Sequence, residues 1–160
     1  MSSERWGAES FDSLYRESFP AVVGSVRWIV GDVEVAREIA QDAFVAALVH
    51  WRKVSSYEKP GTWVRRVAIR EAVRVAKKAR ARPAFIASGS VAQGEPELDV
   101  REAVLALPAA QRAAVVLRYM HDLSISEVAR TMGWSEGTAK THLFRARKAL
   151  AVALAVEGED

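Results

Sequence analysis

The chain alternates between amphipathic stretches and short breaks of Gly, Pro, Asp and Ser, a pattern that predicts an all-α protein. The first stretch, Phe11–Val30, has apolar residues at helical spacing and contains Pro20, which predicts a kink or a break. Gly31 and Asp32 end this helix, and Asp32 can cap the next one, residues 33–51. The core face predicted for this second helix is Ala36, Ile39, Ala40, Ala43, Phe44 and Ala47.

The opposite face of the second helix mixes acidic and amide side chains with valines: Glu38, Gln41, Asp42, Val45 and Val49. Scattered apolar residues are common on solvated surfaces, so this face can simply be solvent-exposed. The alternative is a surface that binds a partner.

The clearest pattern is Leu123–Leu150, which predicts two short helices joined by a tight turn. Ser124 can cap the first helix, and Glu127 three residues later completes a capping box. Gly133 lies where the first helix must stop and the chain must reverse. Ser135 can cap the second helix. This is the helix-turn-helix pattern, whose second helix lies in the DNA major groove.

The second helix of this motif has an apolar face for the core and an opposite face suited to nucleic acid. Lys and Arg can bind phosphate or guanine, Thr can hydrogen-bond to bases, and Phe can contact a thymine methyl group. A solvated helix in an ordinary bundle is the alternative, but an exposed Phe144 among cations favours DNA. The residues on this face are Gly137, Lys140, Thr141, Phe144, Arg145 and Lys148.

A strongly basic helix follows the loop 52–61, with Thr62 as its expected cap. Val64, Ala68, Ala72, Val75 and Ala79 are expected to face the core. Like charges in a row repel by a few tenths of a kcal/mol per pair, which favours a phosphate backbone lying alongside. Tyr57 and Trp63 could stack on unpaired bases or pack into the core. The row and its flanking cation are Arg66, Arg70, Arg74, Lys77 and Lys78.

Charge is distributed unevenly along the chain, although the net charge is only +3. Residues 65–82 carry eight basic side chains and one acidic one, whereas 83–99 carry three acidic and no basic ones. Residues 83–98 lack a sustained period and are rich in Gly, Pro, Ser and Ala, which indicates a linker. We therefore predict helical domains over 1–82 and 98–160, joined by a flexible acidic linker over 83–97. The second domain is expected to open with a helix over 100–107, followed by another that begins at Pro108.

Several functional classes lack support in the sequence. There are no cysteines, and His50, His121 and His142 are far apart, so we expect neither a metal site nor a cofactor. No apolar run reaches the roughly 20 residues of a membrane span, and the N-terminus lacks the order of a signal peptide. These observations predict a cytoplasmic protein.

Together these elements resemble the extracytoplasmic-function (ECF) class of bacterial RNA polymerase sigma factors. The resemblance covers the chain from about Phe11 to Leu154 and is most specific in its last part, which contains the strings LPxxQR and SxGTxKxxLxRAR. The matching stretches are DVEVAREIAQDAFVAAL, TWVRRVAIREAVR and LPAAQRAAVVLRYMHDLSISEVARTMGWSEGTAKTHLFRARKAL. Where the family usually has an Asn and, four residues on, an Asp, this chain has Arg70 and Arg74.

The resemblance implies that the protein binds core RNA polymerase and promoter DNA, both duplex and non-template single strand. The polymerase contacts would be the clamp helices of the largest subunit, through Glu38, Gln41, Asp42 and Val45, and the flap of the second-largest subunit. Members of the family often have an anti-sigma protein as a further partner. The acidic linker would thread into the polymerase cleft where RNA later runs.

The resemblance also assigns DNA contacts. The loop Ser55–Gly61 would hold a flipped base of the minus-ten element, with Tyr57 and Lys59 as candidates. The phosphates of the opening duplex would contact Arg66, Arg70, Arg74, Lys77 and Lys78. The minus-thirty-five element would be read by Lys140, Thr141, Phe144 and Arg145, with Arg147 and Lys148 nearer the backbone.

Two alternatives from other classes remain. A self-sufficient helix-turn-helix repressor or activator would bind duplex DNA tightly without polymerase, but it leaves 65–82 and the face around Gln41 without a role. An enzyme has less support, because the sequence contains no nucleophile elbow, no phosphate-binding glycine loop and no cluster of His, Asp and Glu.

Overall fold

The computed structural model describes residues 8–80 and 96–158, and within these ranges it contains helices and no strand, which confirms the all-α prediction. No described helix is both long and apolar enough to cross a membrane. The elements are α1 (Ala8–Val30), α2 (Val33–Val49), α3 (Trp51–Val54), α4 (Pro60–Arg80), α5 (Pro96–Leu105), α6 (Ala109–Val115), the π-helical turn η2 (Val116–Met120), α7 (Ile125–Met132) and α8 (Glu136–Gly158).

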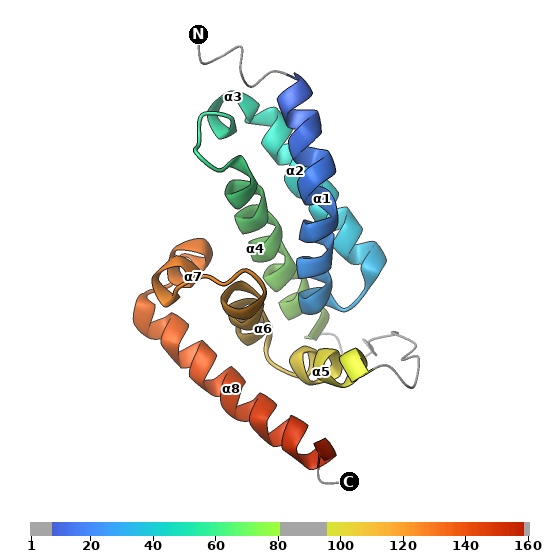
Figure 1. The fold of residues 1–160 in the computed structure, drawn as a ribbon, viewed down its shortest axis with the longest axis vertical. Helices are drawn as coiled ribbons and strands as arrows, with labels where there is room; N and C mark the ends of the chain where they lie inside the picture. The colour runs from blue at the N-terminus through green and yellow to red at the C-terminus, as the bar shows by residue number, and fades with distance from the viewer. Residues whose placement is uncertain (1–7, 81–95, 159–160) are drawn as a thin grey trace.

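The N-terminal half is a bundle of α1, α2 and α4 built around Phe44, which is 1% exposed (Figure 1). The rings of Phe11 and Tyr15 on α1 meet Phe44 edge-on, with centroids 6.4 and 5.1 Å away. Asp32 caps α2 as predicted, because its carboxylate accepts hydrogen bonds from the amides of Glu34 and Val35. All six core residues predicted for α2 are buried.

Four local details of the N-terminal half differ from the predictions. Helix α1 continues through Pro20 without the predicted break; the partly buried Phe19 before the proline and the buried Val22 after it both pack on the core and hold the helix in place despite the lost hydrogen bond. Helix α4 begins at Pro60 rather than at Thr62, because the fixed φ of proline suits the first helical position. The predicted loop contains the short helix α3, and Val75 and Ala79 are only half-buried.

The C-terminal half contains the predicted helix-turn-helix. Ser124 and Glu127 form the capping box at the start of α7, with hydrogen bonds of 3.0 and 3.1 Å. Gly133 has a φ of +71°, a left-handed conformation in which a side chain would be strained. Ser135 accepts a 3.1 Å hydrogen bond from the amide of Thr138 at the start of α8.

The stretch before the helix-turn-helix differs from its prediction. Helix α5 starts at Pro96, so the last two residues of the predicted linker are helical, and it ends at Leu105 rather than at 107. The helix after Pro108 changes to a π-helical turn at Val116, and Asp122 beyond it has a φ of +55°. The predicted linker over 83–95 lies outside the described residues.

The two halves pack against each other, which the sequence did not indicate. Figure 1 shows α6 and α7 beside the α1–α4 bundle and α8 running along the far side of the C-terminal half. Ile29 on α1 belongs to the same buried apolar cluster as Ala113 and Leu117 of the C-terminal half. Each half alone is near the lower size limit for a stable core, so a shared interface stabilises both.

Candidate nucleic-acid interface

Helix α8 presents the face that the sequence predicted for DNA. Its inner side is anchored by Ala139, Leu143 and Ala146, which are at most 3% exposed. Phe144 on the outer side is 65% exposed, and the ammonium of Lys148 lies 5.7 Å from the centre of its ring. The exposed residues of this face are Lys140, Thr141, Phe144, Arg145, Arg147 and Lys148.

Arg147 is held by a residue that the sequence did not single out. Its guanidinium lies over the ring of Tyr119, 5.6 Å from the ring centre, and its Nε donates a hydrogen bond to the phenol oxygen. Tyr119 belongs to the turn η2 and is itself 53% exposed. The π-helical turn changes the direction of the side chains that follow it, and the sequence gives no signal for such a turn.

The basic residues of the predicted phosphate-binding row on α4 fall into two groups, those that are exposed and those that hydrogen-bond to other parts of the protein. Lys77 and Lys78 are exposed, and Arg66 is half-buried near the start of the helix. Arg74 donates hydrogen bonds of 2.6 and 2.9 Å to Glu71, which lower the pKa of that carboxyl and keep it negative. Arg70 points to the other half of the molecule, where its Nε donates a 2.7 Å hydrogen bond to the carbonyl of Thr131.

The candidate base-binding loop borders an open hollow of about 420 Å³. Tyr57 is 37% exposed there, whereas Trp63 is partly buried against the core and its ring lies 6.3 Å from that of His50. Trp63 therefore supports the wall of the hollow as well as lining it. The hollow is lined by Tyr57, Glu58, Lys59, Thr62, Trp63 and Arg66.

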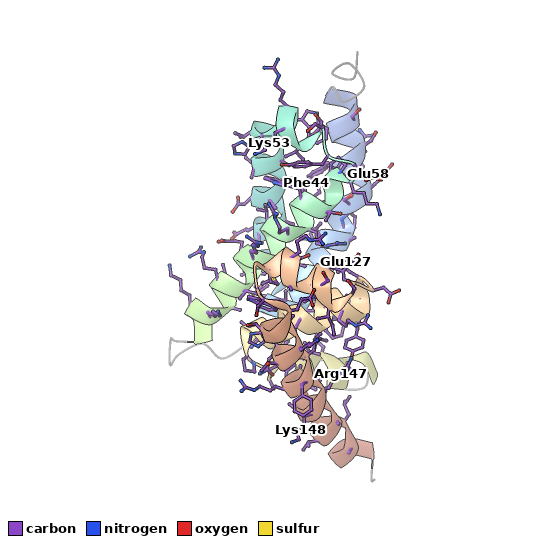
Figure 2. All side chains as sticks on the ribbon, turned by 90° about the vertical axis from the view of Figure 1, so that its left-hand side faces the viewer. Phe44, Lys53, Glu58, Glu127, Arg147 and Lys148 are labelled. Atoms are coloured by element: carbon purple, nitrogen blue, oxygen red, sulfur yellow. The ribbon has the colours of Figure 1, made fainter. Side chains whose placement is uncertain are left out.

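The candidate polymerase surface on α2 is exposed along its whole length: Glu38, Gln41, Asp42 and Val45 all face solvent. Leu48, which the sequence analysis did not select, is 53% exposed and continues the apolar part of this surface between Val45 and Val49. Residues three apart lie on the same face of a helix, so the spacing from Val45 could have identified Leu48 as part of this surface. Figure 2 shows the pocket residue Glu58 toward one end of the molecule, with Arg147 and Lys148 toward the other.

His121 has a structural position that the sequence analysis missed. Its Nε2 lies 2.7 Å from Ser25 Oγ on α1, and its Nδ1 lies 3.3 Å from a guanidinium nitrogen of Arg65 on α4. Burial, and then the nearby charge of Arg65, lowers the pKa of His121 to about 4, so the ring is neutral at pH 7. In residues 8–80 and 96–158 no group of three His, Cys, Asp or Glu could hold a metal ion.

Comparison with known proteins places both halves in one family. Residues 14–82 match Sigma-70 region 2, and residues 97–150 match Sigma-70, region 4. The chain is 30% identical over 151 residues to the ECF RNA polymerase sigma factor SigM of Mycobacterium tuberculosis, covering 89% of this chain and 76% of SigM. It is 29% identical over 146 residues to the ECF sigma factor SigW of Bacillus subtilis, covering 76% of each.

A solved structure has the same fold. It is the sigma factor RpoE of Bartonella quintana in complex with the anti-sigma factor NepR, with a TM-score of 0.75 and 20% identity over 93% of this chain and 99% of that one. The sequence matches and the helix-turn-helix lead to the same conclusion. The chain belongs to the extracytoplasmic-function family of RNA polymerase sigma factors, which bind core polymerase and promoter DNA and direct transcription initiation.

Proposed function

We propose that this sigma factor reads its promoter with two separate surfaces, α8 for the minus-thirty-five element and the Tyr57 hollow for the minus-ten element. The domains that carry them are 1–82 and 98–160, with the acidic segment 83–97 between them. The chain supplies recognition and no catalysis of its own, and it acts in the cytoplasm with the polymerase.

The observation that carries the proposal is the exposure of Phe144 at 65% on a face otherwise made of cations and Thr141. A large ring exposed to water costs free energy unless a partner covers it, and a thymine methyl group in the major groove is a suitable partner. Lys140 and Arg145 lie on the same face and can contact base edges. Arg147 and Lys148 are placed one turn further along, where phosphates are the expected partners.

The hollow beside α4 suits an unpaired base. Tyr57 offers a partly exposed ring for stacking, and Lys59 and Arg66 offer positive charge for the adjoining phosphates. Extruding a base costs a few kcal/mol, which stacking and hydrogen bonding in a pocket can offset. Lys77 and Lys78 extend the positive surface along α4, where the duplex would continue.

The α2 surface is the proposed contact with the clamp helices of the largest polymerase subunit. Val45, Leu48 and Val49 are each more than half exposed, beside the polar side chains of Gln41 and Asp42. An apolar patch with a polar rim is typical of a protein–protein interface. The flap of the second-largest subunit is the proposed second contact, and an anti-sigma protein is a further proposed partner, because RpoE was solved in complex with one.

Run-off transcription tests the proposal. Purified core polymerase is incubated with genomic promoter fragments, with and without this protein. We expect discrete transcripts only when polymerase and the protein are both present. If no transcript forms and the protein alone shifts duplex DNA at moderate salt, the stand-alone regulator is the better assignment.

A further inference from the structure

Glu71 is the only acidic residue in the stretch 65–82, which contains eight basic residues. It lies on α4 with its side chain 37% exposed, and Arg74 three residues later is 57% exposed. A carboxylate at this place repels the phosphates that the surrounding cations attract. A residue that opposes DNA binding by its charge needs another contribution to offset that repulsion.

Glu71 and Arg74 are joined by a two-point hydrogen-bonded fork. The Nε of Arg74 donates a 2.9 Å hydrogen bond to one carboxylate oxygen, and its Nη2 donates a 2.6 Å hydrogen bond to the other. These hydrogen bonds, with the nearby charges of Arg74 and Lys78, lower the pKa of the Glu71 carboxyl, so it is ionised at pH 7. Because the guanidinium is planar, two such hydrogen bonds fix both its position and its plane.

The fork uses only one edge of the guanidinium of Arg74. A guanidinium has five N–H donors, and the Nε–Nη2 edge supplies two of them. Within residues 8–80 and 96–158, Arg74 donates hydrogen bonds to Glu71 alone. The second edge, Nη1–Nη2, is therefore available for a phosphate, which arginine binds through two parallel hydrogen bonds.

The neighbouring cations of α4 are arranged differently. The guanidinium of Arg70 donates its hydrogen bond to the carbonyl of Thr131. Lys77 and Lys78 are exposed, and a long exposed side chain loses rotamer freedom when it binds a phosphate. Arg74 differs from these three in combining a fixed orientation with an open edge.

Arg74 also lies at a suitable distance from the hollow. Arg66 lines the hollow, and Arg74 follows eight residues later, about 12 Å along the helix at about 1.5 Å per residue. This length corresponds to about 3–4 base pairs of duplex at about 3.4 Å each. A duplex that continues along α4 from a base held in the hollow therefore has phosphates level with Arg74.

We propose that Glu71 is a positioning residue, which orients the guanidinium of Arg74 so that its Nη1–Nη2 edge binds one phosphate of the promoter backbone. The inference rests on the proposed function, because it uses the hollow and the phosphate-binding row assigned there. The fixed arginine loses less side-chain entropy on binding than a free one. The guanidinium lies between the two anions and salt screens their repulsion, so positioning outweighs the cost of the negative charge.

A double-mutant cycle tests the inference by the sign of one substitution in two backgrounds. The complex of core polymerase with the full chain is bound to a fluorescent fragment of a promoter mapped by run-off transcription, from 50 to 200 mM salt. We expect Glu71→Gln to weaken binding severalfold, and Arg74→Ala to weaken it and lower the salt slope by about 1. In the Arg74→Ala background, Glu71→Gln removes only repulsion, so binding should stay the same or tighten.

A carboxylate that merely masks Arg74 predicts the opposite sign. Glu71→Gln would then tighten binding in the presence of Arg74, and this result would overturn the inference. Equal weakening in both backgrounds would overturn it too, because the effect would not depend on Arg74. The matched control is Asp12→Asn, which removes the acid of the exposed pair with Arg16 on α1 and should leave affinity and slope near the wild-type values.

NMR of the free protein tests the positioning role without polymerase or DNA. The order parameter of the Nε–H group of Arg74 should be high in the wild type and fall in Glu71→Gln, with unchanged helicity, whereas Asp12→Asn should leave it unchanged. A wild-type value below about 0.6, in the range of flexible groups, would overturn the inference. If the wild-type complex yields no run-off transcript, the proposed function fails instead, and the order parameter still decides whether Glu71 holds Arg74.

Discussion

The guanidinium of Arg147 lies over the ring of Tyr119, 5.6 Å from its centre, and donates a hydrogen bond to its hydroxyl. This pair links the π-helical turn η2 to the outer face of α8 and fixes one cation of the proposed phosphate contact. An arginine held in place loses less side-chain entropy when it binds than a free one.

This relationship predicts how Tyr119 contributes to DNA binding. Tyr119→Ala should weaken binding of the polymerase complex to a minus-thirty-five duplex by severalfold and lower the salt slope by about 1, as for loss of one phosphate contact. Tyr119→Phe keeps the ring and should lie between wild type and alanine. Binding measured from 50 to 200 mM salt checks this, and an unchanged slope in Tyr119→Ala would contradict the positioning role.

Arg145 is predicted to contribute base recognition. Arg145→Ala should lower promoter-specific initiation by about 5- to 150-fold, because a good contact to a base edge contributes about 1–3 kcal/mol of discrimination. Polymerase binding, measured by co-elution or fluorescence anisotropy, should remain at the wild-type level. Arg130→Ala, an exposed cation on α7 outside the proposed site, is the control. Lost polymerase binding in Arg145→Ala would refute the assignment.

The α2 surface is predicted to bind polymerase through apolar contact. Gln41→Arg with Val45→Asp should abolish binding to core polymerase, because it places charge in the centre of a surface that must be desolvated. Both side chains are exposed, so helicity and thermal stability should stay unchanged. Circular dichroism and pull-down measure the two outcomes, and Arg16→Ala, at an exposed ion pair with Asp12 on α1, serves as the surface control. Unaltered binding would mean that another face docks on the polymerase.

Stability should depend on pH through His121. Its pKa is about 4 in the folded protein, against about 6.5 in an unfolded chain, so the unfolded state takes up the proton first. The contribution of His121 is therefore present above about pH 6.5 and is lost as the pH falls toward 4. Arg65 from α4 disfavours the imidazolium, and Ser25 from α1 faces the other nitrogen. Thermal unfolding from pH 7.5 to 4.5 measures the effect.

The comparison for this prediction is His121→Gln, which keeps a polar side chain that does not titrate. Carboxylates titrate in both proteins, so the difference between the two curves isolates the histidine. We expect the wild type to lose more stability on acidification than the variant. Parallel curves across this range would contradict the coupling between His121 and the interface.

Local physical signals explain how much the sequence could predict. The capping box of Ser124 and Glu127 and the left-handed Gly133 depend on residues within a few positions of one another. The positions of the two helices and the turn could therefore be predicted directly from the sequence. The exposed side chains of α8 and α2 followed from helical periodicity in the same way. The predicted break at Pro20 does not occur, because packing of α1 on the core stabilises the helix on both sides of the proline.

The contacts between the halves could not be predicted, because they join residues far apart in the chain. Arg70 resembles its neighbours in a basic row, and only the folded structure shows that it turns to the carbonyl of Thr131. His121 and Ser25 are 96 positions apart. Tyr119 and Arg147 are 28 positions apart, and the π-helical turn η2 that carries Tyr119 has no signature in the residue types.

The central claim is that α8 and the Tyr57 hollow read different promoter elements. The most direct test measures run-off rates for wild type, Phe144→Ala and Tyr57→Ala on one mapped promoter, intact or altered in either element. We predict that Phe144→Ala lowers the run-off rate little further once the minus-thirty-five element is altered, but lowers it fully when only the minus-ten element is altered. For Tyr57→Ala we predict the reverse: little further loss when the minus-ten element is altered, and the full loss when only the minus-thirty-five element is altered. Effects that add for every pairing of variant and element would contradict the account.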